Sequence, residues 1–258
     1  MASSGEPFGP FLNIDAVLGR AKDRIALVGV ELEGGWEKLV GELKPQPDGS
    51  VFHNGIDART PEELTRVNRI KHKGEIPLPP VSQRELPALM KLYYPFYVDK
   101  SCGMHVHLST NRPFTYQRLM VNTPFSYPAT IVEYIWRWAK QEKLPESHAI
   151  WPRLAGLNEY CQHVFHADEQ VKTTNKDYDH HRHGHRYTVI SFCWSRYKTL
   201  ECRLLPMMET ADQGIRAVQE VVMITNAFIA ATKDKEPIHR STVEDSRDME
   251  ITEHRGYV

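Results

Sequence analysis

The chain has 258 residues, 41% of them hydrophobic and 25% charged, which is typical of a globular protein with a substantial core. Its formal net charge of −1 excludes a global positive field for binding nucleic acid or an anionic membrane. No apolar run approaches the ~20 residues of a membrane helix, and residues 1–12 lack the basic and apolar regions of a signal peptide. We therefore expect a soluble, cytoplasmic protein that binds neither nucleic acid nor membrane.

No internal repeat or linker separates two cores, so we expect one domain over residues 1–258, with about 1–12 and 234–258 flexible or peripheral. The cysteines form no Cys-x-x-Cys pair. They are therefore expected to be small buried residues in a reducing compartment rather than zinc ligands; they are Cys102, Cys161, Cys193 and Cys202.

The first predicted strand, residues 25–33, alternates apolar residues with Glu31 and Glu33. Successive side chains of a strand point to opposite faces, so the two carboxylates share one face and the apolar residues the other. Asp48-Gly49-Ser50 then predicts a structural turn, followed by a short returning strand at residues 51–52.

Two helices are predicted next. Residues 60–72 begin with the capping box Thr60-Pro61-Glu62-Glu63, and residues 83–94 carry apolar side chains at helical spacing. Between them, Lys73-Gly74-Glu75-Ile76-Pro77 is expected to break the first helix, which places Glu75 in a loop.

Residues 101–109 predict a second charged strand, with His105 and His107 on one face, roughly 6–7 Å apart, and apolar residues on the other. A third strand, residues 199–205, places Glu201 and Arg203 together in the same way. A strand is also expected at residues 186–194 and helices at 130–143 and 212–232, whereas 112–128 and 147–185, with the cluster His180–His185, show no regular pattern.

Solvated strand faces usually carry Thr, Ser, Lys and mixed charges, so Glu-x-Glu, His-x-His and Glu-x-Arg together favour one functional face. We predict an α+β fold with a curved, mainly antiparallel sheet that presents these residues on its concave face. Helices over 60–72, 83–94, 130–143 and 212–232 would cover the convex face.

The order of these motifs resembles the amidoligase family of the carboxylate–amine ligases, which share a fold with glutamine synthetase and glutamate–cysteine ligase. The resemblance is carried by residues 29–33, 48–50, 74–77, 103–107, 186–187 and 199–203. The sequence differs from the family pattern after Glu75, where it has Ile-Pro-Leu-Pro-Pro and the family usually shows Ser-Pro.

The resemblance implies a role for each matching residue. The magnesium ligands would be Glu31, Glu33, Glu75, His105 and Glu201. His107 would contact the nucleotide phosphates, and Arg203 and Arg186 would meet the transferred phosphate or the substrate carboxylate. Glu201, Arg203 and Arg186 would thus be the catalytic residues.

The implied activity is an ATP- and Mg²⁺-dependent ligation of a carboxylate to an amine through an acyl phosphate, giving an amide or isopeptide bond. The two substrates would be small molecules or peptides. Related ligases build their sites within one chain or between subunits, so a homo-oligomer is compatible with the resemblance.

The main alternative is a cupin-like enzyme that binds iron, manganese or zinc through His105, His107 and a Glu, without ATP. It requires a third histidine on a later strand, does not require Glu31-x-Glu33 or Arg203, and accommodates the long predicted helices poorly. A non-catalytic descendant that binds only nucleotide or a partner is a third interpretation. Each pair also has a structural explanation, as a solvated acidic face or as an ion pair.

Overall fold

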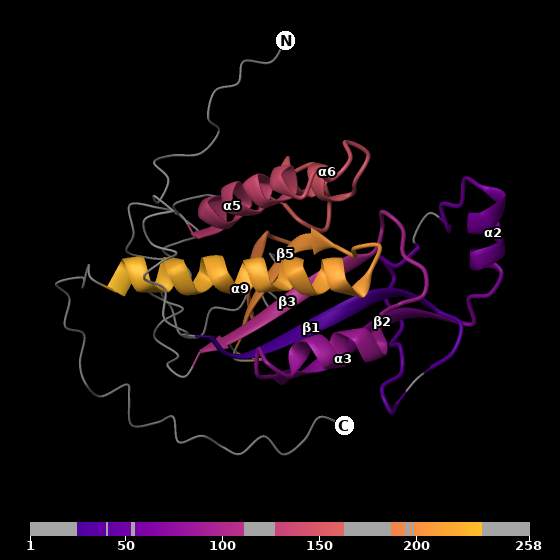
Figure 1. Cartoon of the computed structure of the whole chain (residues 1–258), viewed down its shortest axis with the longest axis horizontal. Coiled ribbons are helices and arrows are strands. Elements are labelled where there is room, and N and C mark those ends of the chain that lie inside the picture. The colour runs from indigo at the N-terminus through magenta and orange to yellow at the C-terminus, as the bar shows by residue number, and fades with distance from the viewer. Residues whose placement is uncertain are drawn as a thin grey trace, which may run out of the picture.

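A computed structural model describes residues 25–39, 41–52, 55–110, 127–162, 187–193, 197 and 199–233. They form an α+β structure built on a five-stranded antiparallel sheet, with strand order β2-β1-β3-β5-β4 (Figure 1). The strands are β1 (Ile25–Trp36), β2 (His72–Val81), β3 (Gly103–Thr110), β4 (Ile190–Cys193) and β5 (Thr199–Pro206). The helices are α2 (Pro61–Val67), α3 (Leu86–Tyr93), α5 (Tyr127–Gln141), α6 (Ile150–Leu154) and α9 (Ala211–Lys233).

Strand register aligns the three charged segments. On β1, Glu31 lies opposite His105 of β3, and Glu33 lies opposite Glu75 of β2. On the far side of β3, His107 lies opposite Glu201 of β5. Directly opposed residues of antiparallel strands have Cβ atoms about 4.5–5.5 Å apart, so this register gathers the charged side chains on one face of the sheet.

The other face of the sheet forms the core. The alternate residues of β1, β3 and β5 are at most 1% exposed; they are Val28, Val30, Leu32, Met104, Val106, Leu108, Leu200, Cys202 and Leu204. Helix α9 contacts β1 and β3, and α3 contacts β1 and β2 (Figure 1). Burying each large apolar side chain stabilises the folded state by about 1.5–3 kcal/mol. Packing on this face therefore fixes the helices against the sheet.

The predicted loop around Glu75 is wrong, because residues 72–81 form strand β2 at one edge of the sheet. The prolines of this segment disfavoured a strand, since proline cannot donate to a ladder. An edge strand tolerates them because only one of its sides pairs with a neighbouring strand. Helix α2 correspondingly ends at Val67, earlier than predicted. It has no buried residue, so the prediction that this helix covers a face of the sheet is also wrong (Figure 1).

The predicted short strand at residues 51–52 is also wrong, because these residues form a turn in which Phe52 has a φ of 55°. That left-handed conformation is incompatible with a strand. Asp48 stabilises the preceding turn, as predicted, by accepting hydrogen bonds from the backbone N–H and the hydroxyl of Ser50, both at 2.6 Å.

Several helix boundaries differ from the predictions by a few residues. Helix α3 begins at Leu86 and α5 at Tyr127, while α9 matches residues 212–232 closely. Segments 112–126 and 163–186, which include His180–His185 and Arg186, lie outside the described residues. The four cysteines are buried thiols, as expected. Across the part of the chain that the structure describes, we find no helix with the length and apolar character needed to cross a membrane.

A buried hydrogen bond joins α9 to the start of β1, where Ile25 N–H donates to Asn226 Oδ1 at 3.0 Å. We predict that Asn226→Ala lowers the free energy of unfolding by about 1–3 kcal/mol, because a buried donor loses its partner. Denaturant unfolding measures this change. The control Met223→Ala, on the exposed side of α9, should change stability by less than about 0.5 kcal/mol.

Candidate active site

Glu31 lies at the centre of the charged face, between the two histidines of β3. Its Oε1 is 3.0 Å from His107 Nε2, and its Oε2 is 2.9 Å from His105 Nδ1. The alternation of β3 explains why both imidazoles reach the same carboxylate: His105 lies opposite Glu31, and His107 lies opposite Gly29, two residues earlier on β1. The shared face predicted from the sequence is therefore present.

His105 connects this carboxylate to two others. Its Nδ1 is 3.6 Å from Glu201 Oε1, and its Nε2 is 3.6 Å from Glu33 Oε1. The histidine is 3% exposed, so these interactions are weakly screened by water. One imidazole thus lies within ion-pair distance of carboxylates from both neighbouring strands.

Glu201 and Arg203 form a buried ion pair on β5, in which Arg203 Nη1 donates to Glu201 Oε1. Arg203 Nε donates to the backbone oxygen of Tyr160 at 3.2 Å, and its guanidinium lies 5.6 Å from the centre of the Tyr187 ring. These contacts orient a cation beside the carboxylate cluster. The charge of Glu201 raises the pKa of Arg203 despite the opposing effect of burial.

Glu33 accepts a hydrogen bond from the backbone N–H of Gly103. A Cβ at Gly103 would lie 2.9 Å from His105 Nε2, 3.2 Å from Arg153 Nη2 and 3.3 Å from Glu33 Oε2. Glycine at this position therefore allows three functional groups to converge. Arg153 is 1% exposed and comes from α6, where its Nη1 donates to the backbone oxygen of Arg203 at 3.0 Å.

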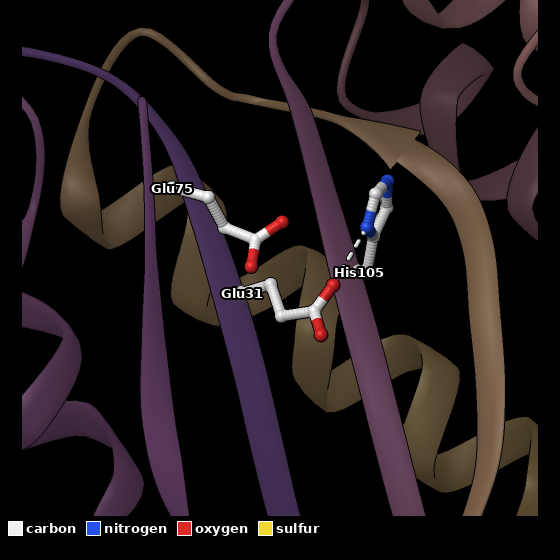
Figure 2. Close-up of side chains that lie close together, drawn as sticks. All are labelled: Glu31, Glu75 and His105. Atoms are coloured by element: carbon white, nitrogen blue, oxygen red, sulfur yellow. Dashed lines mark hydrogen bonds and ion pairs between the residues drawn. The ribbon is translucent and has the colours of Figure 1, made fainter. Parts of the chain in front are cut away.

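Glu75 extends from β2 toward Glu31, on the same side of the sheet as His105 (Figure 2). Three groups of side chains could each hold a metal ion, because their ligand atoms lie within 4.8 Å of one another. They are Glu31, Glu75 and His105; Glu31, His107 and Glu201; and Glu33, Asp48 and Glu75. The groups overlap, so together they form one continuous patch of ligands.

The electrostatics of this patch reflect like charges close together. Burial, followed by the charges of Glu31 and Glu33, raises the pKa of Glu75 to about 9. Burial also raises the pKa of Glu33. Burial opposes ionisation of Glu31 as well, but the positive charge of His107 and hydrogen bonds from both histidines hold its pKa well below its usual range. In return, the Glu31 charge raises the pKa of His107 despite burial.

The structure brings together seven of the predicted site residues, namely Glu31, Glu33, Glu75, His105, His107, Glu201 and Arg203. The eighth, Arg186, lies outside the described residues. Their proposed roles as ligands and catalytic groups stay predictions. Asp48, interpreted from the sequence as a structural turn, occupies that turn and is also part of a ligand group.

Sequence reasoning missed two buried neighbours of the site. Arg153 is the single charge in the short apolar run Ile150-Trp151-Pro152-Arg153-Leu154, and that isolation was a usable signal. Cys193 donates its thiol to Glu201 Oε2 at 3.3 Å. Nothing in the local sequence indicated this contact, because it depends on pairing between β4 and β5.

An array of carboxylate oxygens with one or two imidazoles suits a hard divalent cation such as Mg²⁺ or Mn²⁺. The nearby guanidinium of Arg203 suits an anionic group, because its planar fork can bind phosphate or carboxylate through two hydrogen bonds. The arrangement can therefore hold cations and an anion next to each other. No family model, curated protein or solved structure was found to match the chain.

We predict that the chelator-treated protein loses stability as the pH rises from about 5 toward 9. A carboxyl whose pKa rises on folding from 4.5 to about 9 keeps its proton in the folded state and loses it in the unfolded state over this range. The free energy of unfolding therefore falls as the pH rises. Glu75→Gln, which keeps a donor but cannot ionise, should flatten the dependence of the unfolding temperature on pH. If the unfolding temperature of that variant depends on pH as steeply as that of the wild type, Glu75 is not the group responsible.

We further predict that Gly103→Ala destabilises the protein by about 1–3 kcal/mol, because the added methyl group forces His105, Glu33 or Arg153 to move. Denaturant unfolding, with the shift of the His105 ring resonances in NMR spectra, tests this prediction. Gly49→Ala serves as the control, since no atom lies within 4 Å of a Cβ at that position. Equal stabilities of the two variants would show that the convergence at Gly103 does not constrain the site.

Proposed function

We propose that the protein is an ATP- and Mg²⁺-dependent carboxylate–amine ligase with a catalytic domain of the glutamine synthetase type. The observation that carries this proposal is the set of three overlapping ligand groups around Glu31, with Arg203 beside them. The motif order along the chain, which resembles the amidoligases, supports the same conclusion. The five-stranded antiparallel sheet with helices packed on its apolar face is compatible with that fold.

The donor set fits Mg²⁺, which prefers oxygen ligands and retains several waters. Glu31, Glu33, Glu75, His105 and Glu201 would hold the ions, with Asp48 as a further ligand. The chemistry that Mg²⁺ would supply when bound by these residues is neutralisation of the negative charge of the ATP triphosphate. A nearby cation favours the ionised form of a carboxyl, so the proton that Glu75 holds at neutral pH would leave on binding.

The reaction would proceed in two steps. First, an oxygen of the substrate carboxylate attacks the γ-phosphorus of ATP, the bond to the β-phosphate oxygen breaks, and ADP leaves. The amine nitrogen then attacks the acyl carbon, inorganic phosphate leaves, and the nitrogen gives up a proton to form the amide. The protein forms no covalent intermediate in this scheme, so its contribution is positioning and charge stabilisation.

Arg203 and His107 would act on the phosphoryl group in this scheme. The Arg203 guanidinium, held by Glu201 and the Tyr160 carbonyl, would bind the equatorial oxygens as their charge develops. His107, whose Nε2 contacts Glu31 and whose Nδ1 lies 3.0 Å from the Thr199 hydroxyl, would contact the phosphates. Arg186 keeps its proposed role as a second cation, and the substrates remain a small-molecule or peptide acid and amine.

The cupin-like alternative needs a third imidazole near His105 and His107. The later described strands, β4 (Ile190–Cys193) and β5 (Thr199–Pro206), contain no histidine. Both existing imidazoles contact Glu31, which leaves the remaining carboxylates of the patch without a role in that alternative. These observations favour the ligase, and metal content of the purified protein separates the two: tightly held iron or zinc would support the cupin-like enzyme.

We predict that the protein releases ADP and phosphate from ATP in a Mg²⁺-dependent reaction stimulated by an acid–amine pair, drawn from pooled amino acids and polyamines. Glu201→Gln should lower this turnover by at least about 100-fold, because it removes a ligand charge beside the transferred phosphoryl group. A coupled assay for ADP, with phosphate measured in parallel, gives the rates.

Glutamine is preferred to alanine at this position because Glu201 is 1% exposed and paired with Arg203. Glutamine keeps the volume of the side chain and an oxygen that can accept from Arg203, whereas alanine would leave the buried guanidinium with no acceptor at this position, and breaking a buried pair in this way destabilises proteins by about 3–5 kcal/mol. Glu142→Gln, which alters an exposed ion pair with Arg216, is the matched control and should retain full turnover. Absence of Mg²⁺-dependent nucleotide binding in the wild-type protein would refute the ligase assignment.

A further inference from the structure

Glu201 has donors on both of its oxygens. Arg203 donates to Oε1, and the thiol of Cys193 donates to Oε2 at 3.3 Å. Cys193 is 0% exposed and Glu201 is 1% exposed, so water does not compete readily for either contact. The thiol contact joins a second strand, β4, to a carboxylate that the proposed function uses as a metal ligand.

The register of β4 and β5 explains how the thiol reaches this oxygen. Ser191 lies opposite Glu201 and Cys193 lies opposite Thr199, so Cys193 is the diagonal neighbour of Glu201 on the same face. Ser191 is buried, and its hydroxyl lies 3.7 Å from Cys193 Sγ. The hydroxyl can donate to the sulfur while the thiol donates to Glu201. Glu201 Oε2 is nearer to the sulfur than the Ser191 hydroxyl is, and it is charged, so it is the stronger acceptor of the two.

Arg203 and Cys193 donate hydrogen bonds to different oxygens of the Glu201 carboxylate. Arg203 alone would hold Glu201 in an ion pair that competes with a metal ion for the same lone pairs. With the thiol on Oε2, the carboxylate is held at both oxygens while Oε1 stays 3.6 Å from His105 Nδ1, at the centre of the ligand patch. We propose that Cys193 is a positioning residue that orients Glu201 for metal binding. The inference rests on the metal-binding part of the proposed function.

The role differs from that of an ordinary buried cysteine. Cys202 is equally buried, but it lies on the opposite face of β5, within the hydrophobic core. Replacing either cysteine with alanine removes a similar volume, so loss of packing affects both variants. Only the variant at Cys193 should also change the affinity of the site for a metal. Hydrogen-bond partners of metal ligands typically contribute 10–100-fold to affinity, which sets the size of the expected effect.

The test measures Mn²⁺ binding to the full chain by electron paramagnetic resonance, with Mn²⁺ as the spectroscopic substitute for Mg²⁺ and no nucleotide present. We expect Cys193→Ala to weaken binding by about 10–100-fold, while Cys202→Ala binds as the wild type does. Cys193→Ser restores a donor and should recover most of the affinity. If Cys193→Ala does not fold, Cys193→Val, which fills the space without a donor, takes its place in the comparison with Cys193→Ser.

The outcomes separate this inference from the proposed function. Unchanged Mn²⁺ affinity in Cys193→Ala, or an equal loss in Cys202→Ala, would overturn the positioning role and leave the ligase proposal standing. Equal weakening in Cys193→Ser and Cys193→Ala would also overturn it, because the effect would then not depend on a donor. A wild-type protein that binds no Mn²⁺ would overturn both proposals together.

Discussion

Repulsion among buried carboxylates is the constraint on which the rest of the structure depends. Glu31, Glu33, Glu75 and Glu201 extend from one face of the sheet and Asp48 approaches them from a turn, and with His105 and His107 these residues form three overlapping groups of ligand atoms. The two imidazoles on Glu31 and the guanidinium on Glu201 offset the repulsion, and the raised pKa of Glu75 favours its uncharged form. The same groups that make the face a candidate metal site therefore make it costly to fold without a cation.

The opposite face of the sheet supplies the stability that this arrangement requires. Apolar residues of β1, β3 and β5 are fully buried against the helices, and α9 is also fixed to the start of β1 through Asn226. The functional side chains thus extend from paired strands whose backbones cannot shift independently. Rigid elements of this kind hold ligands more accurately than loops do, which suits a reaction that relies on positioning.

The sequence predicted the shared faces of Glu31 with Glu33, of His105 with His107 and of Glu201 with Arg203, because side-chain alternation in a strand is a local property. It also predicted the α+β class and the approximate position of α9. It failed at β2, where prolines and a preceding helix favoured a loop. Proline disfavours strands in general, and only the edge position in the sheet makes these prolines acceptable.

By itself, then, the sequence determined which residues of β1, β3 and β5 lie on the polar face of the sheet and which on the apolar face. Only the tertiary structure decided which strands are neighbours, and hence that His105 lies among Glu31, Glu33 and Glu201, and that Asp48 approaches Glu75. The contact of Cys193 with Glu201 was decided in the same way. The physical reason is that strand order and register arise from packing between segments far apart in the chain, whereas alternation arises from the backbone of each segment alone.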